Sequence, residues 1–429
     1  MDVKANQSTF KSYLAFFFGQ HISLLGSSVV QFVIVWWITL ETGSAWYLAL
    51  ASIAGFAPMI LLTPFAGVWV DRYSRKLVIA TFDFAQALST ILLIFLFGYG
   101  IISIWLILGI LIFRSCCQAF HQPAVGAIVP LMVPRNRLSR INGLEFVLNG
   151  VMTLLGPIIA ALLLAFWSIN SVLWIDPATF VIAVIPLLLI AIPSVRMEQE
   201  KASFKKDFMG GLSFIRGARG LMPLIFMATA LNFLLTPMST LLPYFVKFVH
   251  YGGATELAFV MASIQAGMLC GGIFMTLARE IKRKMMVSAM FIFICFIMYG
   301  LVAFSPVGLF VFLGACFFVM GFAIAPANVL FRTILQTSVP ANMLGRVNSV
   351  VSSLASMASP FGMAISGVVV GLTGTTNLFV GCAAVGAMVL LGAWFFTDLR
   401  HVENLEATML SNVQADVDAG RSKLPTEKS

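Results

Sequence analysis

The chain has 429 residues, of which 60% are hydrophobic and only 10% are charged, and its mean hydropathy is +0.99. So few charges cannot cover a surface in water, which excludes a soluble globular protein. The apolar runs are about 20 residues long and continuous, which fits membrane-spanning helices rather than the short alternating strands of a β-barrel. We therefore predict an all-α polytopic membrane protein.

The net charge of +9 does not indicate a nucleic-acid partner, because the cations lie at the ends of apolar runs. All six cysteines lie inside apolar runs without Cys-x-x-Cys spacing, so neither a disulfide nor a metal site is predicted. We expect no cofactor. The sequence contains no phosphate-binding loop and no nucleophile–base arrangement, which argues against an ATP-driven pump and against an enzyme.

Taken in chain order, the apolar runs predict twelve spans. They are expected at 13–39, 45–70, 77–98, 102–125, 141–166, 171–193, 221–247, 257–278, 285–304, 307–329, 347–371 and 376–397. If both termini are cytoplasmic, 24 of the 26 basic residues fall in inner segments, Lys247 falls in an outer loop and Arg114 falls within a span. This asymmetry predicts both the number of spans and the cytoplasmic placement of both termini.

The longest inner loop divides the spans six and six. We predict an N-terminal half at 1–193, a linker at 194–220, a C-terminal half at 221–397 and a polar tail at 398–429. Phe204, Phe208, Leu212 and Ile215 follow helical spacing within the linker, which favours a helix lying in the cytoplasmic leaflet over a plain linker.

The two halves resemble each other in sequence. Pro123-Ala124, Val133-Pro134 and Arg140-Ile-Asn142 recur in the same order as Pro326-Ala327, Val339-Pro340 and Arg346-Val-Asn348. A repeat of six plus six spans predicts a transport site between the halves, near the middle of the membrane.

Ionisable side chains inside the hydrocarbon are costly and mark functional sites. Our hypothesis is that Arg114 exchanges contact with Asp83 or Glu145, one of which carries a proton. The alternative is a permanent salt bridge that locks the helices. Asp176 precedes Pro177, so we favour a helix N-cap, and the alternative roles are proton coupling or attraction of a cationic substrate.

Polar residues that recur at helical spacing are the candidates for lining a cavity. Most lie in the first half, where we expect the coupling machinery, and fewer lie in the second half. The candidates are Gln20, Gln31, Gln86, Gln118, His121, Asn142, Asn149, Asn232, Gln265 and Asn328. For His121, a role as a hydrogen-bonded structural residue is favoured over a role as a proton carrier.

Three motifs resemble those of the major facilitator superfamily of transporters, and the resemblance covers the whole chain. Gly67-x-x-x-Asp71-Arg72-x-x-Arg75-Lys76 resembles the signature loop between spans two and three, although Ser74 stands where a glycine is usual. Arg114-x-x-x-Gln118 resembles the span-four motif. Gly156-Pro157 resembles the antiporter motif of span five, with Ala160 and Ala161 where glycines are usual, which weakens the assignment of antiport.

Within this superfamily the chain is most similar to the macrolide-efflux branch. The segments that carry this resemblance are Gly43-Ser44-Ala45, Phe113-Arg114-Ser115, Ala119-Phe120-His121-Gln122-Pro123-Ala124 and Leu344-Gly345-Arg346-Val347. This resemblance implies the twelve-helix fold in two pseudo-symmetric halves. It also implies a conformational gate in which the signature loop, through Asp71, latches against the start of span eleven near Arg346.

The resemblance further implies a monomeric exporter of macrolide-like amphiphilic drugs in a bacterial cell membrane, working by alternating access in exchange for protons. An exporter or flippase of an endogenous amphiphile, such as a siderophore or lysophospholipid, is the alternative. A non-transporting membrane sensor is a third reading, which the intact Asp71 loop and Arg114 argue against.

Overall fold

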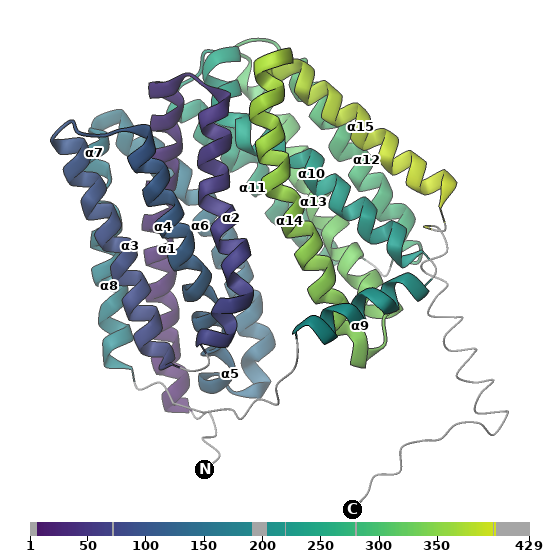
Figure 1. Cartoon of the computed structure of the whole chain (residues 1–429), viewed down its shortest axis with the longest axis horizontal. Coiled ribbons are helices and arrows are strands. Elements are labelled where there is room, and N and C mark those ends of the chain that lie inside the picture. Colours follow the sequence, from purple (N-terminus) through teal and green to yellow (C-terminus); the bar gives the residue numbers. More distant parts are fainter. Residues whose placement is uncertain are drawn as a thin grey trace, which may run out of the picture.

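The computed structural model describes residues 7–70, 73–190, 204–218, 220–278, 281–397 and 399, and every regular element there is a helix (Figure 1). Twelve helices in this part are long and apolar enough to cross a membrane, as predicted. They are α1 (Gln7–Thr42), α2 (Ala45–Val70), α3 (Arg75–Gly98), α4 (Ile104–Gly126), α6 (Leu138–Phe166), α8 (Ile175–Leu189), α10 (Leu221–Tyr244), α11 (Ala254–Leu277), α12 (Lys284–Ala303), α13 (Phe310–Ser338), α14 (Ala341–Thr373) and α15 (Thr375–Phe396).

Short helices fill several connections. They are α5 (Val129–Met132), η1 (Arg135–Arg137), α7 (Ile169–Val172), the π-helical turn η2 (Phe245–Val249) and α9 (Phe204–Gly217). We call the end of the bundle that carries α9 the linker end, and the other the opposite end. The predicted helix of the linker thus forms as α9, and its position in a lipid leaflet stays a prediction.

Three spans extend well beyond their predicted limits, and one of them is α1, which begins at Gln7 rather than at 13. The span expected to end at 329 continues in α13 to Ser338, and the span expected from 347 begins in α14 at Ala341. The prediction followed the apolar runs, which stop where polar residues begin, whereas the helical hydrogen bonds continue through those residues. α13 and α14 therefore reach further toward the linker end than the hydropathy indicates.

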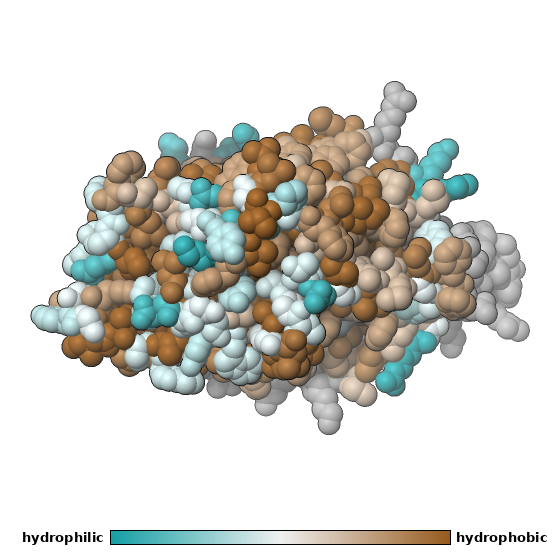
Figure 2. Space-filling model, turned by 90° about the horizontal axis from the view of Figure 1, so that it is seen from above, coloured by the Kyte–Doolittle hydropathy of each residue, from teal (hydrophilic) through white to brown (hydrophobic). Residues whose placement is uncertain are grey.

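The spans from α1 to α8 and those from α10 to α15 lie on either side of the molecule, with α9 below the second group (Figure 1). α2 and α14 pack closely near the opposite end, where a Cβ atom at Gly367 would come within 3.3 Å of the Trp46 Cα. Nearer the linker end the same two helices expose apolar side chains, with Phe65 at 71% and Phe361 at 64%. α2 and α14 thus meet at the opposite end, where hydrophilic and hydrophobic residues mix on the surface (Figure 2).

α11 and α13 cross at glycines. A Cβ atom at Gly267 would come within 2.9 Å of both the Phe318 carbonyl carbon and the Phe322 backbone nitrogen. Gly321 faces the Ile264 carbonyl carbon and the Met268 backbone nitrogen in the same way. Helices in lipid associate largely by van der Waals packing. The glycines let the two backbones approach closely, which strengthens that packing between α11 and α13.

We expect Gly267→Ala to destabilise the protein by about 1–3 kcal/mol, because the backbone of α13 would have to move. Gly272, on the same helix, has no atom within 4 Å of its ideal Cβ position and provides the control. Thermal unfolding in detergent should show a lower midpoint for Gly267→Ala alone. Equal midpoints for the two variants would contradict the close crossing.

His250 links two connections at the opposite end. Its Nε2 atom lies 3.0 Å from Ser305 Oγ, and its ring contacts the Phe245 ring at a centroid distance of 4.7 Å. Burial lowers the pKa of His250 below its ordinary value, because the charged imidazolium loses water. As the pH falls, the imidazole of His250 therefore takes up its second ring proton at a higher pH in the unfolded chain than in the folded chain.

The contribution of His250 to stability is therefore present above the unfolded pKa of about 6.5 and is lost as pH falls toward the folded pKa. We expect wild-type protein in detergent to lose thermal stability over that acidic range more steeply than His250→Gln. If the unfolding midpoints of the two proteins fell in parallel with pH, folding would not change the pKa of His250.

Candidate functional site: a buried charge cluster and a polar pocket

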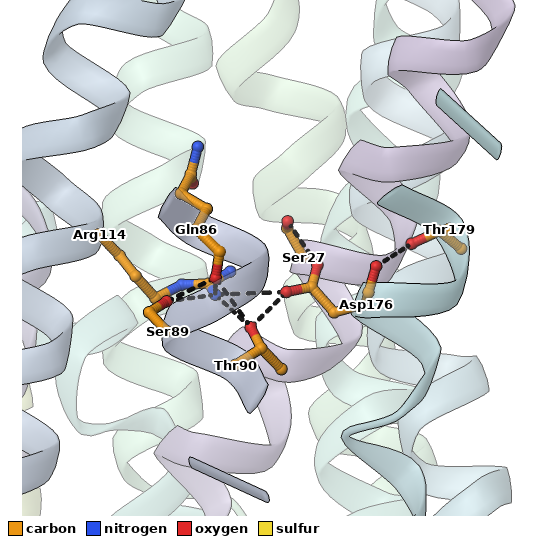
Figure 3. Close-up of polar contacts among 7 residues, drawn as sticks. All are labelled: Ser27, Gln86, Ser89, Thr90, Arg114, Asp176 and Thr179. Carbon is orange, nitrogen blue, oxygen red and sulfur yellow. Dashed lines mark hydrogen bonds and ion pairs between the residues drawn. The ribbon is translucent and has the colours of Figure 1, made fainter. Parts of the chain in front are cut away.

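A buried ion pair joins α4 to α8. Arg114 Nη1 lies 3.3 Å from Asp176 Oδ2, and the two residues are only 9% and 3% exposed. Figure 3 shows both side chains pointing toward α3, which runs between them. Two charges taken out of water are stable only when hydrogen bonds satisfy their remaining donors and acceptors.

Hydroxyl groups from α1 and α3 provide those hydrogen bonds. Thr90 Oγ1 donates to Asp176 Oδ2 at 2.5 Å, and Ser27 Oγ donates to Asp176 Oδ1 at 2.9 Å. Arg114 Nη1 donates to Thr90 Oγ1 at 2.6 Å, to Ser89 Oγ at 3.3 Å and to the Gln86 carbonyl oxygen at 3.3 Å. The charge cluster, which is Ser27, Gln86, Ser89, Thr90, Arg114 and Asp176, thus holds four helices together.

Close packing of α1 on α8 places Ser27 at the carboxylate. A Cβ atom at Gly26 would come within 3.2 Å of both the Asp176 Cα and the Thr179 Cβ, so only glycine fits without movement. The favoured N-cap role of Asp176 is wrong. Trp174 is the N-cap of α8, no side chain caps that end, and the Asp176 carboxylate points to Ser27, Thr90 and Arg114 instead.

A second carboxylate lies in the same half. Asp83 Oδ1 is 2.9 Å from His121 Nε2, and Gln20 Nε2 donates to Asp83 Oδ2 at 3.0 Å. These residues join α1, α3 and α4, and within the described residues no group of three or more metal-ligating side chains forms around them. The predicted contact of Arg114 with Asp83 or Glu145 is absent here, since the acidic partner of Arg114 is Asp176.

A pocket of about 520 Å³ lies in the second half of the chain, between α10, α12, α13 and α14. Its lining residues fall in the portions of these helices nearest the linker end. Leu224, Met227, Phe296 and Phe331 are among its apolar walls, and its polar groups are Thr229, Asn232, Ser288, Asn328, Arg332, Gln336, Asn348 and Ser352. A volume of this size and mixed lining is typical of a site for a small amphiphilic molecule.

The structure brings the cavity candidates to different places. Asn232 and Asn328 line the pocket, whereas Gln20 and His121 contact Asp83. Gln86 offers its backbone carbonyl to Arg114. Gln31, Gln118, Asn142, Asn149 and Gln265 do not line this pocket, which lies in one half rather than between the two halves as predicted for the transport site.

The predicted gate is only partly visible. Asp71 and Arg72 lie outside the described residues, so the latch stays a prediction. Lys76 donates to the carbonyl oxygens of Leu188 and Ile190 at 2.6 and 2.8 Å, which fastens the start of α3 to the end of α8. Arg346 lies against α9, since a Cβ atom at Gly211 would come within 2.9 Å of the Arg346 carbonyl carbon.

Two further gate residues, Gly67 and Arg75, lie at the end of α2 and the start of α3. In the antiporter motif, Gly156 and Pro157 are buried on α6. A Cβ atom at Gly156 would come within 2.7 Å of the Ser28 Cβ, so the glycine lets α6 approach α1. Glu145 also lies on α6.

Arg332 and Gln336 of the pocket were missed because the predicted span ended at 329, one residue after the candidate Asn328. Asn328, Arg332 and Gln336 follow each other at intervals of four on α13, and all three line the pocket. Arg332 was counted only as a cytoplasmic cation, although this i, i+4, i+8 pattern predicts one polar helix face. Ser89 was not among the candidates either, although its side chain contacts Arg114.

Comparison with known proteins points to one family. A model described as "Major Facilitator Superfamily" matches residues 16–359. The chain is similar to Macrolide efflux protein A of Streptococcus pyogenes, with 29% identity over 365 residues that cover 84% of this chain and 90% of that protein. Macrolide efflux protein A of Enterococcus faecalis is also 29% identical, over 324 residues that cover 75% of this chain and all (100%) of that protein.

The fold is similar to a bacterial homologue of the iron transporter ferroportin in an inward-facing state, with a TM-score of 0.71. That match covers 89% of this chain and 98% of the other at 16% identity, so it concerns the fold alone.

We expect Asp176→Asn to cost about 3–5 kcal/mol of stability, because it leaves the buried Arg114 cation without its counter-ion. The double variant Arg114→Gln/Asp176→Asn should recover part of that loss, since neither charge remains. Thermal unfolding in detergent measures both variants, with Glu145→Gln as a control that leaves the ion pair intact. Asp176→Asn protein as stable as the control would contradict the pairing.

Proposed function

The chain belongs to the Major Facilitator Superfamily of transporters, and we propose that it exports macrolide-like amphiphilic drugs in exchange for protons. The observation that carries the proposal is the pocket near the linker end, whose apolar walls and uncharged amide and hydroxyl groups suit an amphiphile rich in hydroxyls and carbonyls. The two relatives named Macrolide efflux protein A support the same substrate class.

Alternating access accounts for the arrangement of the halves. α2 and α14 pack at the opposite end, whereas the pocket lies in the linker-end portions of α10, α12, α13 and α14, which suits a state that is accessible from the linker end. The excess of cations at this end in the sequence favours its placement in the cytoplasm. We therefore propose a bacterial cell membrane protein, acting as a monomer with both termini cytoplasmic, that takes its substrate from the cytoplasm or the inner leaflet.

Asp176 is the proton carrier that the geometry favours. A proton on its carboxylate would remove the negative charge that faces Arg114 and would weaken contacts to α1, α3 and α4 together. Asp83 with His121 is the second candidate, because their contact also depends on protonation. Either group would convert the binding of a proton into a change of helix packing.

One feature of the pocket favours a second candidate substrate. Its lining includes Arg332 and no aspartate or glutamate. A cationic drug therefore finds no counter-charge in the lining, whereas an anionic amphiphile made by the cell does. Export of an endogenous anionic amphiphile is the alternative function.

The first test is the accumulation of a radiolabelled macrolide in cells that express wild-type protein or the empty vector. We expect low accumulation with the wild type and a rise to the vector level when a protonophore is added. Accumulation equal to the vector under both conditions would reject macrolide export. Low accumulation that a protonophore leaves unchanged would reject proton coupling.

The second test asks whether the pocket binds the substrate. Asn328→Ala removes one hydrogen bond worth about 0.5–1.5 kcal/mol, so substrate affinity should fall about twofold to tenfold. Gln265→Ala on α11, outside the pocket lining, is the matched control. Binding of the labelled macrolide to purified protein measures both affinities. Equal affinities for the two variants would show that the substrate binds outside this pocket.

A further inference from the structure

A groove runs between the first turns of α1 and α6, in the half of the chain that does not hold the pocket. Phe10, Leu14 and Phe18 form one wall, and Ile141, Leu144 and Val147 form the other. The volume of the groove is about 560 Å³, and its remaining lining residues are Arg137, Arg140 and Gly143. It is thus an apolar channel with two cations and no acidic residue in its lining.

The groove opens to the surroundings of the protein. Phe10, Leu14 and Phe18 are spaced by four residues and so lie on one face of α1. Phe18 and Val147 are each 48% exposed, although both belong to membrane-spanning helices. Exposed apolar side chains on a span require an apolar neighbour, which in a membrane is a lipid acyl chain.

The two arginines lie at the linker end of the groove, where the spans begin. The guanidinium of Arg137 stacks on the Phe10 ring with 4.7 Å between its Cζ and the ring centroid, which holds the cation at the mouth of the groove. Arg140 follows in the first turns of α6. Among the described residues no carboxylate forms an ion pair with either arginine.

We propose that this groove is a binding site for an anionic diacyl phospholipid. Arg137 and Arg140 would bind its phosphate, since guanidinium groups form strong charge-assisted hydrogen bonds with phosphate oxygens. The aromatic and aliphatic walls would hold an acyl chain along α1 and α6. Basic sites between spans at this membrane surface are where acidic headgroups bind.

Gly143 gives a sharp test of the acyl-chain site. No atom lies within 4 Å of its ideal Cβ position, so a larger side chain can enter the groove without a clash. Gly143→Leu should therefore fill the groove while favouring the helix, because leucine has a higher helix propensity than glycine. Arg137→Gln/Arg140→Gln tests the headgroup site separately.

The experiment measures lipid binding by native mass spectrometry of the purified full-length protein, titrated with dioleoylphosphatidylglycerol or dioleoylphosphatidylcholine. We expect wild-type protein to bind the phosphatidylglycerol about tenfold more tightly than the phosphatidylcholine. Both variants should lose about tenfold in affinity for the phosphatidylglycerol. Lys282→Gln/Arg283→Gln, which removes two exposed cations at the linker end outside the groove, should bind it like the wild type.

Equal binding of the two lipids by the wild type would overturn the proposal, as would unchanged phosphatidylglycerol binding in either variant. Displacement of the lipid by an equimolar amount of inorganic phosphate would also overturn it, because the arginines would then form a site for a free anion. Thermal unfolding without added lipid checks that each variant is folded. These outcomes are independent of the exported substrate, since they measure binding without transport.

Discussion

The ion pair between Arg114 and Asp176 is the constraint on which the first half of the molecule depends. Each charge has left water, so their attraction stabilises the fold only while the hydroxyls of Ser27 and Thr90 complete the hydrogen bonds. These partners come from α1, α3, α4 and α8, and Gly26 lets α1 come close enough to take part. Under the proposed proton coupling, a proton on Asp176 would therefore weaken contacts that join four helices.

The buried ion pair and the pocket lie in different halves of the molecule. The Arg114–Asp176 ion pair and the Asp83–His121 contact lie in the half that runs from α1 to α8. The pocket lies among α10, α12, α13 and α14, and Arg332 is the charged residue in its lining. The proposed coupling between a proton and a substrate would then have to cross the interface of the halves. Contacts between the halves include the packing of α2 on α14 at Gly367 and that of α6 on α11, where Gly150 faces Leu269.

The sequence predicted the fold and the family, both of which are confirmed, because apolar length, cation asymmetry and loop motifs are local properties. It also placed Arg114 inside a span, where the structure shows it buried, but it did not identify its partner. Whether Arg114 meets Asp83, Glu145 or Asp176 depends on how α4, α3, α6 and α8 rotate about their axes, and spacing along one helix carries no such information. Asp176 was misread because a carboxylate in the first turn of a helix resembles a cap in sequence. The position of Arg332 in the pocket lining was missed because the helix continues beyond the end of the apolar run.

α1 is the element through which these features act on one another. Gln20 and Ser27 on this helix bind the two buried carboxylates, and Ser28 faces Gly156 on α6. Its first turns form the wall of the groove that α6 completes. A protein interior is close-packed, so α1 cannot move at one of these contacts while staying fixed at the others. Protonation of a carboxylate and occupation of the groove would therefore bias the same helix, the first through its buried face and the second through its face toward lipid.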